Sequence, residues 1–226
     1  EVRGKGLAEQ LSVFLTGNKA ERAGFLFTWK MMARSREFRI RVYPSIGYFV
    51  VIIFMLFFKN RSAMAISNTD TYFSFKPMAA IYFSSIVITV AVSQMIYSDK
   101  FRASWIFFIV PVPRPGEIIS GALKATVFQF AFFMAILTFG GGLWMAGPAI
   151  LPNLILAVCN QILITYAIAM ISFRQLPFSQ PIGTAQKTGQ FARSLSMMFF
   201  SLVVGSTHYF IYKYNIAVGV FLLVSL

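Results

Sequence analysis

Long apolar stretches alternate along the chain with shorter segments that hold most of its charged residues. Five stretches approach the length of a membrane span, because a hydrocarbon core of about 30 Å is crossed by about 20 apolar residues in a helix. A sixth begins close to the end of the sequence and is incomplete. The pattern predicts an all-α fold, a polytopic transmembrane helical bundle of five to six spans. The expected spans are 42–58, 78–97, 118–145, 149–172, 195–212 and 216–226.

The region before the first span predicts an N-terminal interfacial amphipathic helix. Residues 22–41 contain no proline and a single glycine, so we expect them to be helical. Basic and apolar side chains fall on separate stripes of this helix, although the separation is imperfect. Such a helix lies in the headgroup region with its apolar face in lipid; a solvated, partly ordered basic segment is the alternative. The basic stripe holds Lys30, Arg34 and Arg41, the apolar stripe holds Phe25, Trp29 and Met32, and Phe27, Met31 and Phe38 lie outside it. The expected division is therefore a cytoplasmic or interfacial region, 1–41, and a transmembrane domain, 42–226.

Composition supports a membrane protein. The chain is 58% hydrophobic and 12% charged, whereas a soluble domain carries about 25% charged residues. Its net charge of +13 would suggest a nucleic-acid partner in a soluble protein. Basic residues beside spans are explained by anionic lipid instead, so we expect membrane lipid and no nucleic acid as a partner. Cys159 is the single cysteine, which excludes a disulfide within the chain and a cysteine-based metal site.

Lysine and arginine residues are concentrated in alternate connecting segments. Residues 1–41 hold nine, 98–124 hold four and 173–193 hold three, which places 16 on one side of the membrane. The other side receives only four: Lys59, Arg61, Lys76 and Lys213. By the positive-inside rule the N-terminus and both long connections lie in the cytoplasm. We therefore expect a multi-pass protein of a bacterial inner (plasma) membrane.

The connection between the second and third spans carries the most distinctive pattern. Ser98 precedes a segment in which Phe101, Trp105 and Phe108 recur at helical spacing, with Arg102 beside them. The segment is too short to span a membrane. It predicts a short amphipathic helix at the cytoplasmic surface, either a passive interfacial helix or a docking element; the pattern favours neither. Three prolines are expected to end this helix and stiffen the elbow that follows it: Pro111, Pro113 and Pro115.

The spans carry no chemistry typical of an enzyme or an ion-driven carrier. No Walker loop is present, and no predicted span has an Asp or Glu in its interior. Asn160 and Gln161 lie near the middle of a span, where hydrogen bonding between helices is favoured over substrate contact. His208 is the single histidine, and we expect it at a polar interface near Tyr209; a weak alternative is an axial ligand for haem or chlorophyll. We therefore expect no catalytic residues, no metal site and no cofactor in this chain.

The layout resembles the permease subunit of a type-2 ATP-binding-cassette exporter. The resemblance rests on the topology and on two segments, ASWIFFIVPVPRPGEIISGALKA at 103–125 and LPFS at 176–179. It implies a coupling helix between spans two and three, and a smaller cytoplasmic contact between spans four and five. It also implies a separate ATPase subunit that binds ATP, and a second permease copy or homologue. The residues implied to couple to the ATPase are Phe101, Arg102, Trp105, Phe108, Pro111, Pro113 and Pro115.

Two functions remain open from the sequence. The first is the permease of such an exporter, not an enzyme by itself, with ATP hydrolysis on the partner chain. The second is a non-transporting structural subunit of a larger membrane complex, associated with pigment or haem. The sequence stops at Leu226 within an apolar stretch, where the family has a complete sixth span, so we expect it to be part of a longer protein. Lipid, glycan, peptide and drug substrates are all compatible with its apolar spans.

Overall fold

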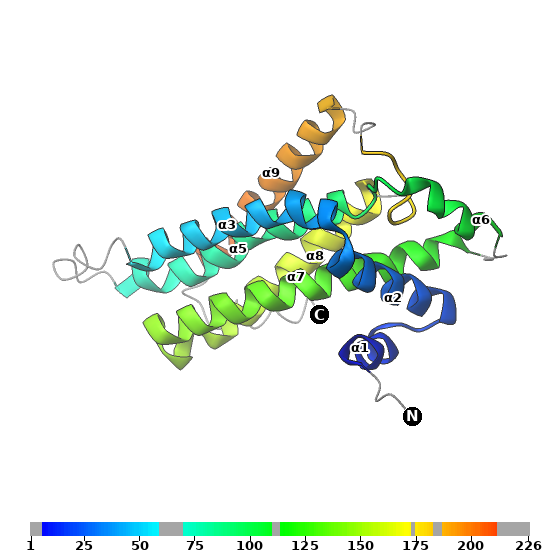
Figure 1. Ribbon diagram of the computed structural model, residues 1–226. Coiled ribbons are helices and arrows are strands. Elements are labelled where there is room, and N and C mark those ends of the chain that lie inside the picture. The colour runs from blue at the N-terminus through cyan, green and yellow to red at the C-terminus, as the bar shows by residue number, and fades with distance from the viewer. Residues whose placement is uncertain (1–5, 59–69, 110–113, 173–174, 183–186, 212–226) are drawn as a thin grey trace.

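The computed structural model describes residues 6–58, 70–109, 114–172, 175–182 and 187–211 (Figure 1). Every regular element in these ranges is a helix, apart from one isolated bridge between Tyr97 and Gln180. The predicted all-α class is therefore confirmed. The elements are α1 (Leu7–Leu15), α2 (Lys19–Arg34), α3 (Arg36–Phe58), α5 (Asp70–Gln94), η1 (Phe101–Trp105), α6 (Ile106–Ile109), α7 (Pro115–Ala146), η2 (Pro148–Ile150), α8 (Leu151–Ser172) and α9 (Lys187–Ile211).

Three of the described helices are long and apolar enough to cross a membrane. They are Arg36–Leu56 in α3, Pro115–Trp144 in α7, and Pro148–Ala167, which joins η2 to α8. The apolar parts of α5 and α9 are shorter, at Met78–Gln94 and Phe199–Ile211. A membrane protein with at least three candidate spans is thus supported, while the full set of five to six stays a prediction. The expected sixth span, 216–226, lies outside the described residues.

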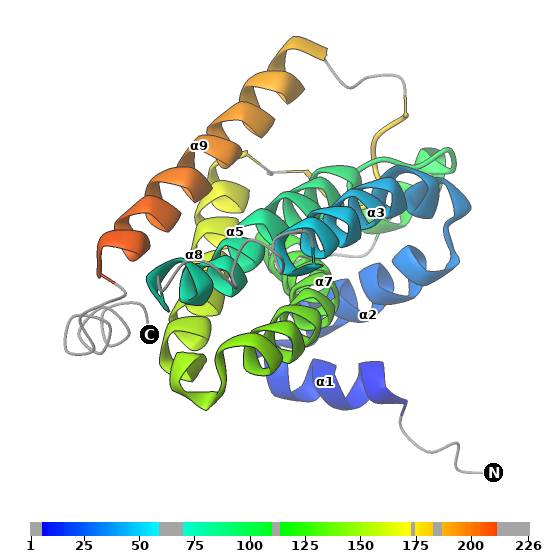
Figure 2. The same ribbon diagram turned by 90° about the vertical axis from the view of Figure 1, so that its left-hand side faces the viewer.

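Helix α5 is the centre of the bundle, because it packs against α3, α7, α8 and α9. Figure 2 shows α3 on one side of α5, with α8 and α9 on the other and α7 below. The main core cluster runs from α2 through α3, α5, α7 and α8 to Phe178. Met78, Ile81 and Ile88 of α5 are buried, and so is Met95, which directly follows the helix. Burial of large apolar side chains on these helices supplies the main driving force for their association within the protein.

The single helix predicted over 22–41 is two helices separated at Ser35. The N–H of Ser35 closes α2 on the carbonyl of Met31, and the Ser35 hydroxyl accepts a hydrogen bond from the N–H of Phe38 at 3.2 Å. A serine in this position caps the start of the following helix, so α3 begins in a new direction. The helix that contains the first candidate span therefore starts at Arg36, six residues ahead of the start predicted for the span.

Helix α2 packs on α7 and not on lipid through its predicted apolar face. Phe25 and Met32 are buried in the core formed with α7, and this helix pair is the most extensive in the structure. At the crossing a glycine of each helix meets the other backbone. A Cβ on Gly24 would lie 2.4 Å from the carbonyl oxygen of Ile118, and one on Gly121 would lie 2.0 Å from that of Glu21. The expectation of a headgroup-facing stripe was wrong because close backbone contact lets α7 cover it.

The connections lie at two opposite ends of the bundle. Helices α1, α2 and α6 and the loop 175–182 occupy one end, and the turn between α7 and α8 lies at the other (Figure 1). Gly147 adopts a φ of 70° in that turn, a conformation that glycine reaches without steric cost. The α7–α8 turn thus lies opposite the end that holds the loop 175–182. Which end faces the cytoplasm stays a prediction.

Candidate functional site

The segment 98–109 begins with a tighter helix than the sequence pattern predicted. Phe101–Trp105 is a 3₁₀ helix, followed by one α-helical turn, Ile106–Ile109. The Ser98 hydroxyl accepts a hydrogen bond from the N–H of Lys100 at 3.1 Å and starts the turn. Successive residues of a 3₁₀ helix are about 120° apart, so residues four apart do not share a face. The predicted Phe101–Trp105–Phe108 stripe is therefore split, and Phe101 is partly buried while the other two are exposed.

An apolar patch covers the outer side of this segment. It consists of Trp105, Ile106, Phe108 and Ile109, which are 58%, 51%, 78% and 65% exposed, and we call it the coupling patch. Arg102 is also exposed beside it. Four neighbouring large apolar side chains on one surface segment mark a contact site for protein or membrane. Trp105 and Phe108 were predicted at this surface; Ile106 and Ile109 were not singled out by the i, i+4, i+7 count.

Aromatic rings anchor the inner side of the same segment. Phe107 packs edge-on against Phe27 of α2, with ring centroids 5.4 Å apart. Phe27 in turn meets Phe178 of the loop 175–182 at 6.1 Å, and Phe38 of α3 meets Phe178 at 6.2 Å. Phe27 and Phe38 are residues that fell outside the predicted apolar stripe. Because these two phenylalanines lie outside the stripe, they could have indicated a second apolar contact surface.

The second long connection is hydrogen-bonded to the first. The N–H groups of Phe178 and Gln180 donate to the carbonyls of Met95 and Ile96 at 2.8 and 2.9 Å, and the N–H of Ser98 donates to the carbonyl of Gln180 at 2.9 Å. Phe178 has a φ of 54°, which is uncommon for a residue with a side chain. Its buried ring and backbone hydrogen bond hold it there. The two connections therefore form one unit at the end of α5.

Of the three prolines predicted to form a stiff elbow, one lies in the described residues. Pro115 is the first residue of α7, a position where proline costs no hydrogen bond. Pro111 and Pro113 lie outside the described residues. The N–H of Glu117 donates to the carbonyl of Arg114 at 3.0 Å. Helix α7 thus starts within a few residues of the coupling patch.

A set of polar contacts around Glu21, which we call the Glu21 interlock, joins α2 to α7. The sequence pattern did not predict it. The Glu21 carboxylate lies 2.7 Å from the Lys124 ammonium and accepts hydrogen bonds of 2.8 Å from the Ser120 hydroxyl and from the N–H of Gly17. Lys124 also donates to the carbonyl of Leu15 at 2.9 Å. The signal was a lysine six residues inside the predicted span 118–145, since a charge at such a position calls for a partner.

The Glu21 interlock predicts a stability that depends on pH. Desolvation by burial raises the pKa of this carboxyl, but the hydrogen bonds from Lys124, Gly17 and Ser120 together outweigh it, so the pKa is lowered from 4.5. A lowered pKa contributes stability that is present above 4.5 and is lost as the pH falls through the folded-state value. We expect the melting temperature of the wild type to exceed that of Glu21→Gln at neutral pH, and the difference to shrink below pH 4.5. Parallel melting curves with a difference independent of pH would contradict this.

A second polar cluster lies between α5, α8 and α9. The Tyr82 hydroxyl is 2.9 Å from His208 Nδ1 and accepts from the Asn160 amide at 3.2 Å, and His208 Nε2 is 3.3 Å from Asn153 Oδ1. Gln161 donates to the Ser84 hydroxyl at 2.5 Å. Asn160 and Gln161 therefore join helices, as the sequence analysis favoured.

His208 is buried, at 3% exposure, and not at a polar interface as expected. Asn153 Oδ1 is an acceptor, so Nε2 carries the proton and Nδ1 accepts from Tyr82. Both ring nitrogens are thus engaged by protein, and an iron or magnesium ion bound here would have to displace one of these hydrogen bonds. No group of three or more His, Cys, Asp or Glu residues suited to a metal occurs within the described part of the chain.

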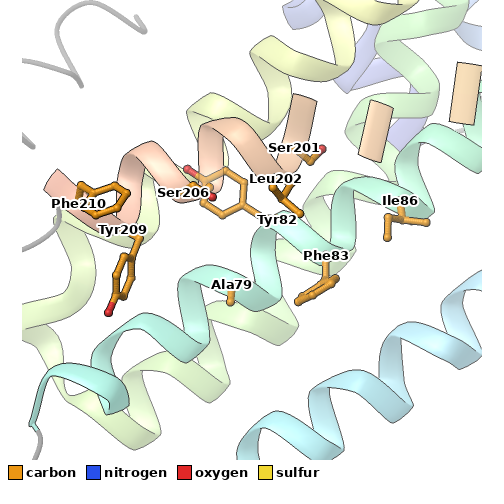
Figure 3. Close-up of a pocket in the computed structure, with 10 residues that line it drawn as sticks. Ala79, Tyr82, Phe83, Ile86, Ser201, Leu202, Ser206, Tyr209 and Phe210 are labelled. Carbon is orange, nitrogen blue, oxygen red and sulfur yellow. The ribbon is translucent and has the colours of Figure 1, made fainter. Parts of the chain in front are cut away.

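A groove of about 410 Å³ lies beside this cluster, between α5 and α9 (Figure 3). Its walls are apolar side chains such as Phe83, Leu202 and Phe210, and Tyr82 connects it to the polar cluster. Gly205 allows the close approach of the two helices, because a Cβ there would lie 3.4 Å from the Tyr82 ring. The groove offers an apolar surface with few polar groups. Comparison with protein-family models, curated proteins and solved structures gives no significant match for this chain.

Proposed function

We propose that the chain is the transmembrane permease subunit of an ABC exporter, driven by ATP hydrolysis on separate ATPase subunits. The observation that carries the proposal is the coupling patch: four exposed apolar side chains on a segment whose inner side is anchored by Phe107. A helix that presents apolar anchors to a groove is a common way to bind a partner. Arg102, exposed beside the patch, would meet an acidic rim of that groove.

The surroundings of the patch support a mechanical role. The segment follows directly from α5, leads within a few residues into α7, and contacts α2 through the Phe27–Phe107 pair. The loop 175–182 adds hydrogen bonds to the end of α5. Displacement of the patch by an ATPase would therefore act on three helices at once, which is how rigid elements transmit a local shift to a distant site. The permease would work as a pair with a second copy or a homologue.

The same proposal places the chain in a bacterial inner membrane with the patch and the N-terminus in the cytoplasm. It is supported by the excess of basic residues in the segments that the structure gathers at the patch end. The structural-subunit alternative depends on His208 as a pigment or haem ligand. Because both nitrogens of that ring are engaged, the geometry adds no support to it.

Substitution Trp105→Ala tests the docking surface. We purify the tagged full chain from its native membrane and measure the vanadate-sensitive ATP hydrolysis that co-purifies. Removing a central tryptophan from an interface costs about 2 kcal/mol or more, which corresponds to about a 30-fold loss of affinity. We expect most of the co-purifying activity to disappear, with membrane insertion unchanged.

Trp144→Ala is the matched control, because Trp144 is also 58% exposed but lies near the far end of α7. It should retain the ATPase. Equal retention of ATPase activity by the two variants would contradict the assignment of the coupling patch. The absence of any co-purifying ATPase in the wild type, together with a bound tetrapyrrole, would favour the structural-subunit alternative.

A further inference from the structure

Helix α1 exposes large apolar side chains on the side that faces away from the bundle. Leu7 is 78% and Phe14 is 89% exposed, and because they lie seven residues apart they share one stripe of the helix. Val13, which is about half exposed, lies beside Phe14. Glu9 is the one charged residue of α1, and it is partly buried on another side of the helix. The exposed stripe of α1 is therefore apolar and uncharged.

The opposite side of α1 is fixed to the rest of the protein. Leu11 and Leu15 pack against the main core cluster. The hydroxyl of the buried Ser12 accepts a hydrogen bond from Arg22 Nε of α2 at 3.1 Å, and Lys124 of α7 donates to the carbonyl of Leu15. These contacts set the rotation of α1 about its own axis, so the stripe of Leu7 and Phe14 stays on the outside.

Helix α1 runs across the long axis of the bundle. In Figure 1 helices α3, α5 and α7 run lengthwise, whereas α1 is seen end-on. After the turn of 90° in Figure 2, α1 is seen from the side, and it lies below α2 and α7 in both views. Because the candidate spans follow the long axis, a helix across that axis lies in the plane of the membrane.

The contacts of Lys124 place α1 at the level of the lipid headgroups. Residues 125–144 of α7 carry no charge, and about 20 apolar residues cross the hydrocarbon core, so Lys124 marks its boundary. Side chains on a helix tilt toward its N-terminus. The Lys124 ammonium accordingly meets the Glu21 carboxylate, which also binds Ser120 one turn nearer the start of α7. The Leu15 end of α1 thus lies on the headgroup side of the boundary.

The size of the exposed stripe favours lipid over a protein partner. A stable protein interface buries about 1,000 Å² or more in total, and three side chains on a helix of nine residues supply only part of that area. A short amphipathic helix in the membrane plane needs no more than such a stripe, because its apolar side chains enter the boundary between headgroups and acyl chains. The orientation and level of α1 match this arrangement.

We propose that α1 lies along the membrane surface with Leu7 and Phe14 inserted between the lipid headgroups. The bilayer itself covers the stripe, and no particular headgroup charge is required because the stripe is uncharged. An interfacial role was expected for residues 22–41, but α7 covers the apolar stripe there. The proposal does not depend on the exporter function. It assigns to α1 a membrane contact that is attached to the α2–α7 crossing through Leu15 and Ser12.

Spin labelling of the purified full chain in phosphatidylcholine bilayer discs tests the proposal. Each variant carries one labelled cysteine in a Cys159→Ala background. Power saturation measures the collisions of the label with oxygen, which concentrates in hydrocarbon, and with a nickel chelate, which stays in water. The oxygen-to-nickel ratio for Leu7→Cys and Phe14→Cys should be several-fold above that for Lys19→Cys, an exposed position at the start of α2. It should stay below that for Ile136→Cys, which is exposed within the uncharged part of α7.

A second substitution separates the apolar stripe from charge. Phe14→Ser should raise the nickel collisions of a label at Leu7→Cys, whereas Glu9→Gln, on another side of α1, should leave them unchanged. Circular dichroism identifies the variants that fold, and either label position alone decides the outcome. Nickel collisions as frequent at position 14 as at position 19 would overturn the proposal, because α1 would then face water. A label at position 14 that neither probe reaches would also overturn it, because protein, such as a second copy, would then cover the stripe.

Discussion

Gly121→Ala is expected to destabilise the protein by about 3 kcal/mol, although alanine is the better helix former. The added methyl group would lie 2.0 Å from the carbonyl oxygen of Glu21 and 2.9 Å from the backbone nitrogen of Phe25. No side-chain rotation relieves these contacts, since the atoms that it meets belong to the backbone of α2. The helices must separate, and burial of Phe25 and Met32 is then reduced. Thermal unfolding in detergent, followed by circular dichroism, measures the loss.

Gly116→Ala is the matched control on the same helix. A Cβ at this position meets nothing within 4 Å, and Gly116 is the second residue of α7, so the substitution should change the stability by less than about 0.5 kcal/mol. Limited proteolysis gives a second readout, because detachment of α2 from α7 should speed cleavage between α1 and α2. Equal melting temperatures for Gly116→Ala and Gly121→Ala would contradict the close crossing.

Glu21→Ala is the second substitution with a large expected effect, a destabilisation of about 2–3 kcal/mol. The change leaves the Lys124 ammonium without its carboxylate partner. It also removes the acceptor for the Ser120 hydroxyl and the Gly17 N–H. The loss stays below that of a fully buried ion pair because the Lys124 side chain is 31% exposed and keeps its bond to the Leu15 carbonyl. Chemical denaturation of Glu21→Ala and of a matched control variant measures this loss of stability.

Glu117→Ala removes a carboxylate from the same region and serves as that control. Glu117 accepts a single 3.4 Å hydrogen bond, from the exposed amide of Asn18, so its loss should cost less than about 0.5 kcal/mol. The double variant Glu21→Ala/Lys124→Met should be more stable than Glu21→Ala alone, because it removes the stranded charge. A double variant less stable than Glu21→Ala would show that the interlock does not work through the pair.

The helical class and the three candidate spans could be predicted from the sequence because apolarity and length are local properties. Helices α3, α7 and α8 carry continuous apolar stretches that no tertiary contact is needed to explain. The apolar part of α5, Met78–Gln94, is shorter, and it contains Ser84 and Ser85. Both serine hydroxyls bond back to α5 carbonyls, and they meet Gln161 and Ser201 of the neighbouring helices. Their role could not be assigned before those neighbours were known.

The segment 98–109 was predicted from the sequence as a surface element, but its geometry was not. Aromatic spacing indicated that Trp105 and Phe108 are surface anchors, and both are exposed. The same spacing placed Phe101 on their face, which the 3₁₀ turn prevents. The choice between 3₁₀ and α geometry depends on the hydrogen bonds of Ser98 and Lys100 and on the packing of Phe107. These are tertiary contacts, which cannot be inferred from residue spacing.

The α2–α7 crossing was the largest omission, for a related reason. Glycines 24 and 121 are informative only as a pair, and 97 positions separate them in the chain. A helical wheel of α2 alone shows an apolar stripe that either lipid or protein would cover. Lys124 inside a predicted span was the one local indication that a partner helix carries an acid. Glu21 met that requirement.

Helices α2 and α7 cross where Gly24 of one and Gly121 of the other each admit the opposite backbone. The Glu21–Lys124 ion pair lies at the same crossing, and Phe25 and Met32 of α2 are buried in the core formed with α7. Helix α2 is thus attached to α7 by backbone contact, charge and apolar burial together. Because only Ser35 separates α2 from α3, the orientation of α2 on α7 sets the direction in which the first candidate span leaves this end of the bundle.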